Sequence, residues 1–264
     1  MPFHEIDGVR YYSFESLADC GVTQAIFTRQ GGVSPEPWAA LNLGGTVGDD
    51  PQRVAENRLR AFQAVGRSSA SLYDVWQVHG DEVVIANAPR PLHTPHIKAD
   101  AMLTDRPEVT LFMRFADCVP ILLCDPRRRV VGLAHAGWKG TVRRVAAAAV
   151  EAMQAHYGSA PADIRAAIGP SIAAHHYPVG PDVAAEAQGA FGTDAASLLP
   201  ARNGVHSGVQ FDLWAANRLV LEQAGVHQVE VSGLCTACQI QDWYSHRAEA
   251  GHTGRFGVLI ALER

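Results

Sequence analysis

Two apolar segments of the sequence flank a short polar turn, and this hairpin pattern constrains the fold more than any other feature. Val119–Cys124 and Arg129–Ala134 are each typical of a buried strand, and the residues between them, Asp125–Arg128, include the Asp-Pro pair that favours a tight turn. Strands joined by so short a connection run antiparallel. Since other strands and helices alternate along the chain, the sequence predicts an α+β fold, a layered α/β sandwich with a mixed sheet, rather than a doubly wound parallel fold.

Apolar runs and end signals predict the remaining elements. Further strands are predicted at Val83–Ala86, Val109–Phe115, Ile164–Ile168, Val229–Ser232 and Phe256–Leu262. N-cap, proline and glycine signals predict helices over Pro51–Gly66 (with Asp50 as N-cap) and Gly140–His156, and helices beginning near Pro181 and at Asp212. In the first helix, Ala55, Leu59 and Phe62 form the expected apolar stripe. The chain has no internal repeat, so we expect a single domain over residues 1–264.

Composition limits the partners and the compartment. The 22 lysines and arginines against 27 aspartates and glutamates give a net charge of −5, which argues against a nucleic acid polymer but allows a small anion pocket. The five cysteines are unevenly spaced and odd in number, which favours free thiols in a reducing compartment. The N-terminal residues lack the order of a signal peptide, and no apolar run approaches membrane-spanning length. We therefore expect a cytoplasmic monomer or homodimer that acts on small molecules and has no membrane partner.

The hairpin also predicts a close pair of metal-ligand side chains. If the turn contains four residues, Cys124 faces Arg129, and the same register places Cys118 opposite His135. Directly opposed residues share a face of the sheet, with their Cβ atoms about 5 Å apart. A thiolate and an imidazole at that separation can bind a common ion.

His79 is the best candidate for a third ligand, because it ends an apolar segment just before Gly80 and Asp81. Histidine and cysteine are the usual ligands of zinc, and a catalytic zinc keeps three protein ligands and one open position. Copper competes well for the same donors and is the alternative ion. Without a metal, the same pair predicts a cysteine hydrolase with Cys118 as nucleophile and His135 as base. Taken singly, each residue is more typical of the core than of a metal site.

The segment from His135 to Thr141 joins a strand to a helix and contains Gly137, Lys139 and Gly140. Glycines permit close backbone approach, and a helix N-terminus offers unpaired N–H groups. With the charge of Lys139 added, the segment predicts a phosphate-binding turn. The alternative is an ordinary tight turn with a lysine facing solvent.

Two other motifs predict no metal site on their own. Cys235 and Cys238 form a single CxxC motif without the second pair that a zinc ribbon needs. His175 and His176 are adjacent, so their side chains are expected to point apart and not to share a metal. Cys20 and Cys124 are expected in the core.

Several short motifs along nearly the whole chain resemble the laccase-domain family. This family was formerly described as multicopper polyphenol oxidases, is related to a peptidoglycan-editing factor, and is now viewed as purine nucleoside phosphorylase-like. The matching segments include Phe27–Ser34, Leu41–Gly44, Gln77–Gly80, Ala99–Ala101, Ala116–Pro120, Ala134–Gly140, Ile168–Ile172, Phe211–Leu213 and Thr253–Arg255. The AHAGWKG and ADCVP stretches are the most specific of them.

The resemblance implies a site and an activity. It implies zinc on His79, Cys118 and His135, phosphorolysis of adenosine, inosine and methylthioadenosine, and adenosine deamination. By position, Arg29 and Asn42 would line the substrate pocket, and Arg247 would lie near it, all three as substrate-binding residues. The chain departs from the family pattern at His175–His176, where members often have paired cysteines, and at Ala248, where they often have a second arginine.

The implied chemistry assigns further roles. Lys139 and Arg29 are predicted to hold phosphate, and Asp117 is predicted to move protons, although its position next to Cys118 in a strand would direct it to the other face. A true multicopper oxidase is the main rival. Its sites commonly use His-x-His pairs, and none of the 12 histidines here is separated from another by one residue. A peptidoglycan-precursor-editing enzyme is a further alternative.

Overall fold

The computed structural model describes residues 2–91, 93–201 and 208–264. Within these ranges the strands form two six-stranded sheets and one two-stranded sheet. The first sheet has the order β1 (Phe3–Ile6), β2 (Val9–Tyr12), β3 (Val22–Phe27), β14 (Phe256–Leu262), β7 (Thr110–Phe115), β4 (Leu72–Tyr73). The second has the order β13 (Gln228–Val231), β10 (Arg165–Ile168), β8 (Val119–Asp125), β9 (Val130–Ala136), β6 (Ala101–Thr104), β5 (Val83–Ile85). The short pair is β11 (Pro178–Val179) with β12 (Val209–Gln210).

Both large sheets are mixed, as predicted. β4 pairs parallel with β7 in the first sheet, and β10–β13 and β5–β6 pair parallel in the second, while the other pairs are antiparallel. The sequence predicts one sheet, whereas the structure has two that pack face to face. The side chains of β8 explain this arrangement, because Ile121 and Leu123 face the helices and Leu122 and Cys124 face the first sheet. A strand that is apolar on both faces needs cover on both.

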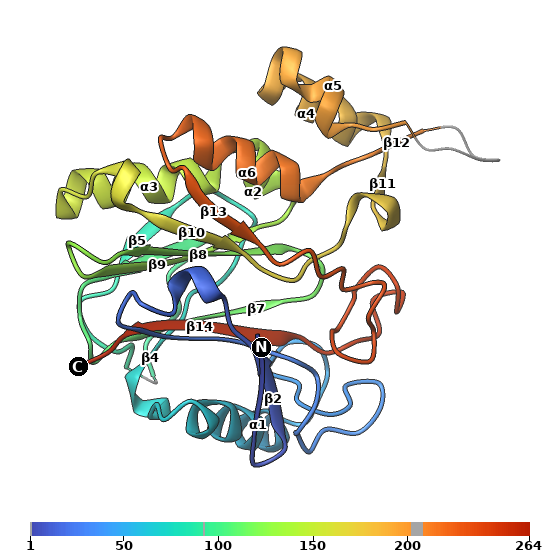
Figure 1. Ribbon diagram of the computed structural model, residues 1–264. Coiled ribbons are helices and arrows are strands. Elements are labelled where there is room, and N and C mark those ends of the chain that lie inside the picture. Colours follow the sequence, from blue (N-terminus) through green and yellow to red (C-terminus); the bar gives the residue numbers. More distant parts are fainter. Residues whose placement is uncertain (1, 92, 202–207) are drawn as a thin grey trace.

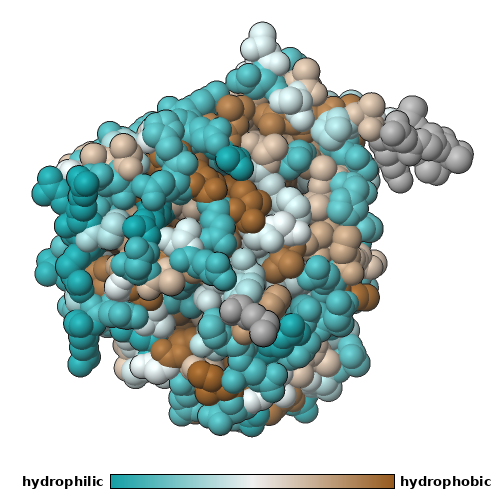
Figure 2. All heavy atoms as spheres, in the orientation of Figure 1, coloured by the Kyte–Doolittle hydropathy of each residue, from teal (hydrophilic) through white to brown (hydrophobic). Residues whose placement is uncertain are grey.

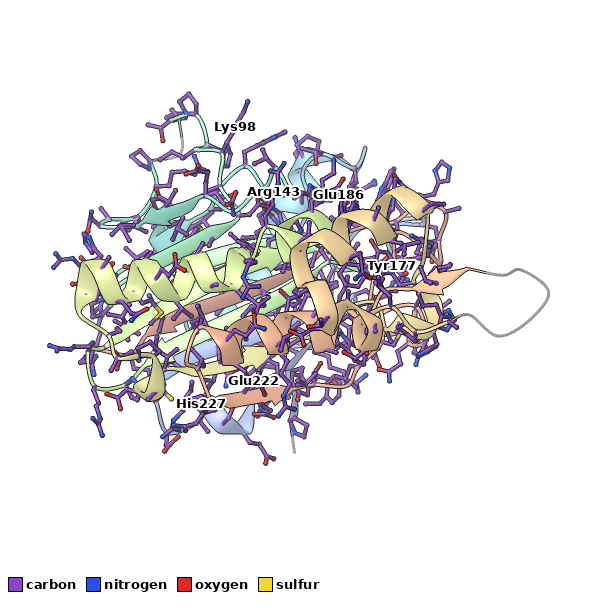
Figure 3. The ribbon with its side chains drawn as sticks, turned by 90° about the horizontal axis from the view of Figure 1, so that it is seen from above. Lys98, Arg143, Tyr177, Glu186, Glu222 and His227 are labelled. Carbon is purple, nitrogen blue, oxygen red and sulfur yellow. The ribbon has the colours of Figure 1, made fainter. Side chains whose placement is uncertain are left out.

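Helices complete a four-layer arrangement of helix, sheet, sheet and helix (Figure 1). They are α1 (Pro51–Ala64), α2 (Trp138–Val142), α3 (Val145–Tyr157), α4 (Pro181–Phe191), α5 (Ala195–Leu198) and α6 (Leu213–Gln223). Figure 3 shows α3 and α6 side by side across the second sheet, and Figure 1 shows α1 beneath the first. Three apolar clusters fill the spaces between successive layers within the described ranges. On the surface seen in Figure 2, hydrophilic residues surround smaller hydrophobic patches.

α1 begins where its signals predict, but it buries a different face. The Asp50 side chain accepts a hydrogen bond from the Gln52 N–H and caps the helix. Ala55 and Leu59 are exposed, so the predicted stripe is wrong for both. The buried face is centred on Asn57, whose side-chain amide donates to the carbonyl groups of Ala40 and Asn42 and to the hydroxyl of Ser34. The need to satisfy these loop groups turns the helix toward the face that carries Val54, Ala61 and Phe62.

The predicted helix over Gly140–His156 is wrong as a single element. Arg144 has φ of 64°, in the left-handed region, and separates α2 from α3. The other predicted helix starts, at Pro181 and after Asp212, are confirmed. Within the described ranges, no helix is both long and apolar enough to cross a lipid bilayer. All five cysteines lie within these ranges as free thiols, and Cys20 and Cys124 are buried as expected.

Candidate metal centre and its pocket

The hairpin of β8 and β9 is confirmed, but its predicted register is wrong by two residues. Asp125 pairs with Val130, and Pro120 pairs with His135. The turn therefore contains residues 126–129, and Asp125 belongs to the strand.

The Asp125 side chain explains the shift. One of its oxygens accepts hydrogen bonds from the N–H groups of Arg127 and Arg128. Asp125 therefore forms the last pair of the hairpin through its backbone and caps the turn through its side chain. Because side chains alternate with a period of two, a slip of two residues keeps each side chain on its predicted face. Cys118, just before β8, therefore still lies beside His135.

His79, Cys118 and His135 form a cluster whose ligand atoms all lie within 4.8 Å of one another. The connections that carry His79 and Cys118 both cross from the first sheet to the second, β4 to β5 and β7 to β8. His135 lies in β9 itself and is buried, whereas His79 is exposed and has φ of 61°. The three predicted ligands are thus brought together with one side open to solvent, an arrangement that could hold a metal ion.

A buried carboxylate that the sequence did not indicate supports this cluster. Asp100 accepts a hydrogen bond from His135 Nδ1 at 2.8 Å, and also from the N–H groups of Val78, His79 and Gly80. Burial alone would raise the pKa of Asp100, but the contact with His135 and the N–H groups of Gly80 and Val78 outweigh burial and lower it. Since Nδ1 of His135 is held by Asp100, Nε2 is the nitrogen left for the cluster. Asp100 lies in a matched family segment, yet no spacing rule links it to His135.

Cys118 and His135 perturb each other's ionisation. Burial opposes the Cys118 thiolate, but the His135 imidazolium and hydrogen bonds from His135 and His79 outweigh burial and lower its pKa to about 6. Burial likewise opposes the His135 imidazolium, but the Cys118 thiolate and Asp100 raise its pKa to about 9. These opposite shifts favour a thiolate–imidazolium pair in the metal-free protein, and the thiolate is the form that binds metal.

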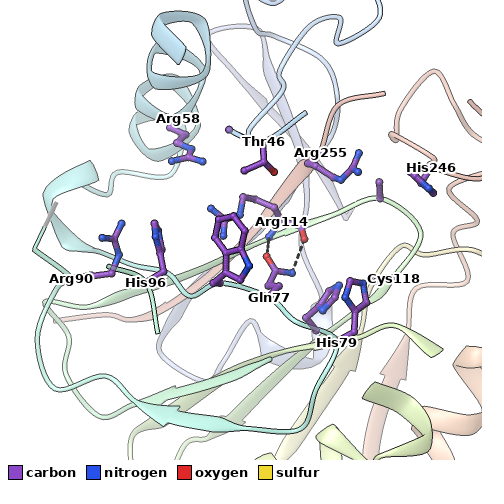
Figure 4. A pocket seen from close by; sticks show the side chains of 15 residues that line it. Thr46, Arg58, Gln77, His79, Arg90, His96, Arg114, Cys118, His246 and Arg255 are labelled. Carbon is purple, nitrogen blue, oxygen red and sulfur yellow. Dashed lines mark hydrogen bonds between the residues drawn. The ribbon is translucent and has the colours of Figure 1, made fainter. Parts of the chain in front are cut away.

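The cluster lines one side of a cavity of about 600 Å³ (Figure 4). The lining residues come from at least five separate parts of the chain: Gly44, Gly45, Thr46, Arg58, Trp76, Gln77, His79, Arg90, His96, Arg114, Ala116, Cys118, His135, His246 and Arg255. Figure 4 shows Arg58, Arg90 and His96 away from His79 and Cys118, with Arg114 between. We call Arg58, Arg90, His96 and Arg114 the basic side of the pocket.

One buried carboxylate lies behind the basic side. Asp74 accepts hydrogen bonds from Arg90 Nε at 2.7 Å and Arg114 Nη1 at 3.0 Å, and lies 3.2 Å from His96 Nε2. Burial opposes the Asp74 carboxylate, but Arg114 and Arg90 outweigh it and lower its pKa. Arg58 donates only to a backbone carbonyl, that of Leu43, in its described contacts. Burial lowers the pKa of Arg58 to about 10, so it keeps its charge at neutral pH.

Three of the predicted substrate residues lie elsewhere. Lys139 is exposed, with its ammonium group 5.4 Å from the centre of the Trp138 ring. Arg29 is bonded to Glu249 and to backbone carbonyls, and the exposed Arg247 donates to the carbonyl of Pro178. In the part of the chain that the structure describes, none of these three lines the pocket.

Asn42 and Asp117 lie behind the pocket wall. Asn42 is fully buried and accepts hydrogen bonds from the N–H groups of Gly44 and Arg255, both of which line the pocket. The carboxylate of Asp117 accepts from Thr236 Oγ1 and Ser245 Oγ and from the Arg247 N–H, at 2.6 to 2.7 Å. Both side chains therefore hold loops in place next to residues of the site.

Comparison with known proteins agrees with this architecture. The model of the multi-copper polyphenol oxidoreductase laccase family matches residues 23–263. The chain is 44% identical over 243 residues to a protein of Deinococcus radiodurans named purine nucleoside phosphorylase, which covers 92% of this chain and 90% of that protein. It is 36% identical over 250 residues to purine nucleoside phosphorylase YlmD of Bacillus subtilis, and this alignment covers 89% of this chain and 87% of that protein.

Solved structures show the same fold. A Bacillus licheniformis hypothetical protein YfiH aligns with a TM-score of 0.90 at 33% identity, over 99% of both chains. YlmD from Geobacillus stearothermophilus aligns with a TM-score of 0.89 at 34% identity, over 100% of this chain and 99% of that one. These matches confirm the α+β fold class and the resemblance that the sequence motifs indicate. The chain therefore belongs to the multi-copper polyphenol oxidoreductase laccase family.

Proposed function

We propose that this protein is a zinc-dependent purine nucleoside phosphorylase, which converts adenosine, inosine or methylthioadenosine and phosphate into the free base and the ribose 1-phosphate. The relatives named purine nucleoside phosphorylase support the reaction class. The observation that carries the proposal is that one pocket joins the His79, Cys118 and His135 cluster to a basic side suited to an anion.

Charge supports phosphate as the co-substrate. Among the described residues that line the pocket there are arginines and histidines and no carboxylate. Asp74 behind them offsets part of this charge, whereas the guanidinium groups of Arg58 and Arg255 donate to backbone carbonyls in their described contacts. Arginine binds phosphate oxygens with paired N–H groups, so this side can hold phosphate and stabilise its charge as the reaction proceeds.

Size and an aromatic wall support a nucleoside as the second substrate. A cavity of about 600 Å³ lies within the range of about 300–1,000 Å³ typical of small-molecule sites. Trp76 lines the cavity and is 49% exposed, so its ring offers a flat apolar surface to a purine. A sugar held between the base and the phosphate would then lie near the middle of the pocket.

The donor set fits zinc. Two imidazoles and a thiol whose pKa is lowered to about 6 are ligands that zinc prefers, and Asp100 fixes the ring of His135. When bound, the ion supplies a Lewis acid that withdraws charge from a substrate group at the open position. Such a centre would also serve the adenosine deamination that the family resemblance implies.

The proposed reaction forms one bond, breaks another, and moves one proton in net terms from hydrogen phosphate to the purine. A phosphate oxygen attacks the anomeric carbon of the ribose, and the bond between that carbon and the purine nitrogen breaks. The electron pair leaves with the purine, which takes up a proton. The arginines contribute by holding the phosphate in line with the anomeric carbon, an effect of proximity and orientation.

Purified, zinc-loaded protein tests the proposal when it is incubated with a nucleoside panel with and without phosphate, and the products are separated by chromatography. Free base and ribose 1-phosphate should appear only with phosphate, while inosine from adenosine without phosphate would report deamination. Arg58→Met should raise the phosphate KM by about tenfold or more, the value of one charge-assisted contact. Arg60→Met, on the same helix but outside the pocket, should leave it unchanged. Lys139→Ala in the same series tests the lysine predicted from the sequence.

A cysteine hydrolase, including one that edits peptidoglycan precursors, is the second candidate, because the lowered pKa of Cys118 and the raised pKa of His135 favour a nucleophilic thiolate beside an imidazolium without any metal. Iodoacetamide separates the two readings. A zinc thiolate should react slowly until a chelator is added, whereas a free nucleophile should react fast throughout. Phenol oxidation should be negligible, because the described candidate metal clusters offer three ligands each and not the larger histidine sets of a multicopper centre. Rapid phenol oxidation with copper and no nucleoside turnover with zinc would contradict the proposal.

A further inference from the structure

A second group of metal-ligand side chains lies outside the pocket. His175 and His176 belong to the 3₁₀ turn η4 (Ala174–His176), and Cys238 ends the CxxC motif. Their ligand atoms all lie within 4.8 Å of one another, and His175 Nε2 is 3.1 Å from Cys238 Sγ across 63 residues of sequence. The fold thus joins two motifs that the sequence keeps apart and that predict no metal site separately.

The expectation that His175 and His176 point apart is wrong. Their ring centroids are 4.6 Å apart. In a 3₁₀ turn, neighbouring side chains are separated by about 120° around the axis, rather than directed to opposite faces as in a strand. Both rings can therefore turn toward Cys238.

Backbone pairing fixes the distance between the two segments before any ligand arrives. Ser171 and Cys235 form a parallel bridge, in which the Ser171 N–H donates to the carbonyl of Leu234 and the Thr236 N–H donates to that of Ser171. The buried Cys235 accepts a hydrogen bond from the Ala173 N–H at 3.4 Å. The donors thus project from two connected turns and not from flexible surface chains.

We propose that His175, His176 and Cys238 form a second metal site, which takes zinc or a similar divalent ion of borderline softness. Two imidazoles and one thiol are a nitrogen and sulfur donor set for such ions, and the exposure of all three side chains leaves a fourth position for water. Binding releases the Cys238 thiol proton to solvent and forms three bonds from ligand atoms to the ion. The ion would connect η4 to the CxxC turn, whose Thr236 bonds to Asp117 beside Cys118.

Metal stoichiometry tests this site independently of catalysis. Protein freed of metal, reduced, and reloaded with excess zinc should carry two ions per chain after desalting. Cys238→Ser and Cys118→Ser should each carry one ion, and the double variant none. His175→Ala should behave as Cys238→Ser, whereas His227→Ala, an exposed histidine outside both clusters, should keep two.

Cobalt gives a second readout. In Cys118→Ser, an added Co²⁺ ion should show a thiolate charge-transfer absorption that comes from Cys238, and the further change Cys238→Ser should remove it. The proposal is overturned if the wild-type protein takes up one ion and Cys118→Ser shows no such absorption. A Cys235–Cys238 disulfide that survives reduction and blocks uptake would overturn it as well. Since neither readout depends on turnover, a failure here leaves the proposed phosphorylase activity to be judged by its own assay.

Discussion

Asp100→Asn is expected to weaken zinc binding at the pocket cluster without unfolding the protein. The Asp100 side chain holds His135 through one oxygen and receives the N–H groups of Val78, His79 and Gly80. Asparagine has nearly the same shape but replaces one oxygen with an NH₂ group. The substitution therefore removes acceptor capacity and charge while leaving the packing almost unchanged.

The geometry sets the size of the effect. If the remaining oxygen stays toward His135 and His79, the NH₂ group faces the N–H groups of Val78 and Gly80; if the amide is flipped, it faces His135 Nδ1 instead. Either way, donors face donors at contacts each worth about 1.5–3 kcal/mol. Loss of such a partner of a ligand lowers metal affinity by about 10- to 100-fold. That factor corresponds to about 1.4–2.7 kcal/mol, comparable to one lost contact.

Competition with a chromophoric chelator measures the zinc affinity. Asp100→Asn should raise the zinc Kd about 10- to 100-fold, with the same stoichiometry at saturation. Asp74→Asn is the matched control, because Asp74 is also a buried, charge-paired carboxylate behind the same pocket but does not touch the cluster in its described contacts. If Asp100→Asn binds zinc as tightly as Asp74→Asn and the wild type, Asp100 does not position His135 for metal binding.

Two further substitutions test the packing of the site and the charges behind it. Gly137→Ala would place a Cβ atom 2.9 Å from Cys118 Sγ, so it should lower zinc affinity. The control Gly189→Ala, with no atom within 4 Å of its new Cβ, should leave zinc affinity unchanged and stabilise α4 by about 0.4–1 kcal/mol. Equal zinc affinities for the two variants would contradict the predicted crowding of Cys118. Asp74→Asn should lower the free energy of unfolding at pH 7 by about 3 kcal/mol, because Arg114 loses its buried partner. Since the folded pKa of Asp74 is lowered, the extra stability of the wild type over Asp74→Asn should be complete above the unfolded pKa of about 3.9 and lost as the pH falls through the folded value. Urea titrations at several pH values measure this difference in the free energy of unfolding. A difference that does not change with pH would contradict the role of the ion pair.

Long apolar runs are the elements that the sequence predicts best, whereas the four-residue β6 and the mixed run of β3 are missed although they are largely buried as well. β8, β9 and β14 are entirely buried, and their continuous apolar runs mark them plainly. β1 and β2 at the edge of the first sheet are partly exposed and were not predicted. The register error has a single cause, because Asp125 acts as strand end and turn cap together, a double role that its sequence position does not reveal.

Only part of the candidate site could be predicted from the sequence. Cys118 and His135 lie on one hairpin, so local spacing could bring them together. Arg58, Arg90 and Arg114 come from a helix, a connection and a strand, and only the tertiary fold makes them neighbours. Lys139 is predicted to bind phosphate because it lies close in sequence to His135, yet its side chain is exposed and lies beside Trp138.

The two connections that carry His79 and Cys118 from the first sheet to the second would give an ion bound at the cluster a mechanical role. His79 and Cys118 lie where the chain passes from the first sheet to the second, and His135 belongs to the second sheet alone. Sliding of one sheet over the other would change the distances among these side chains, so an ion bound there would oppose that motion. Truncation of a side chain in the core between the sheets, for instance at Met113 or Leu122, should then change the coordination geometry of a bound ion, although neither residue is a ligand. The coordination geometry of a bound ion would thus depend on how the two sheets are aligned, and removal of the ion would make it easier for the sheets to slide over each other.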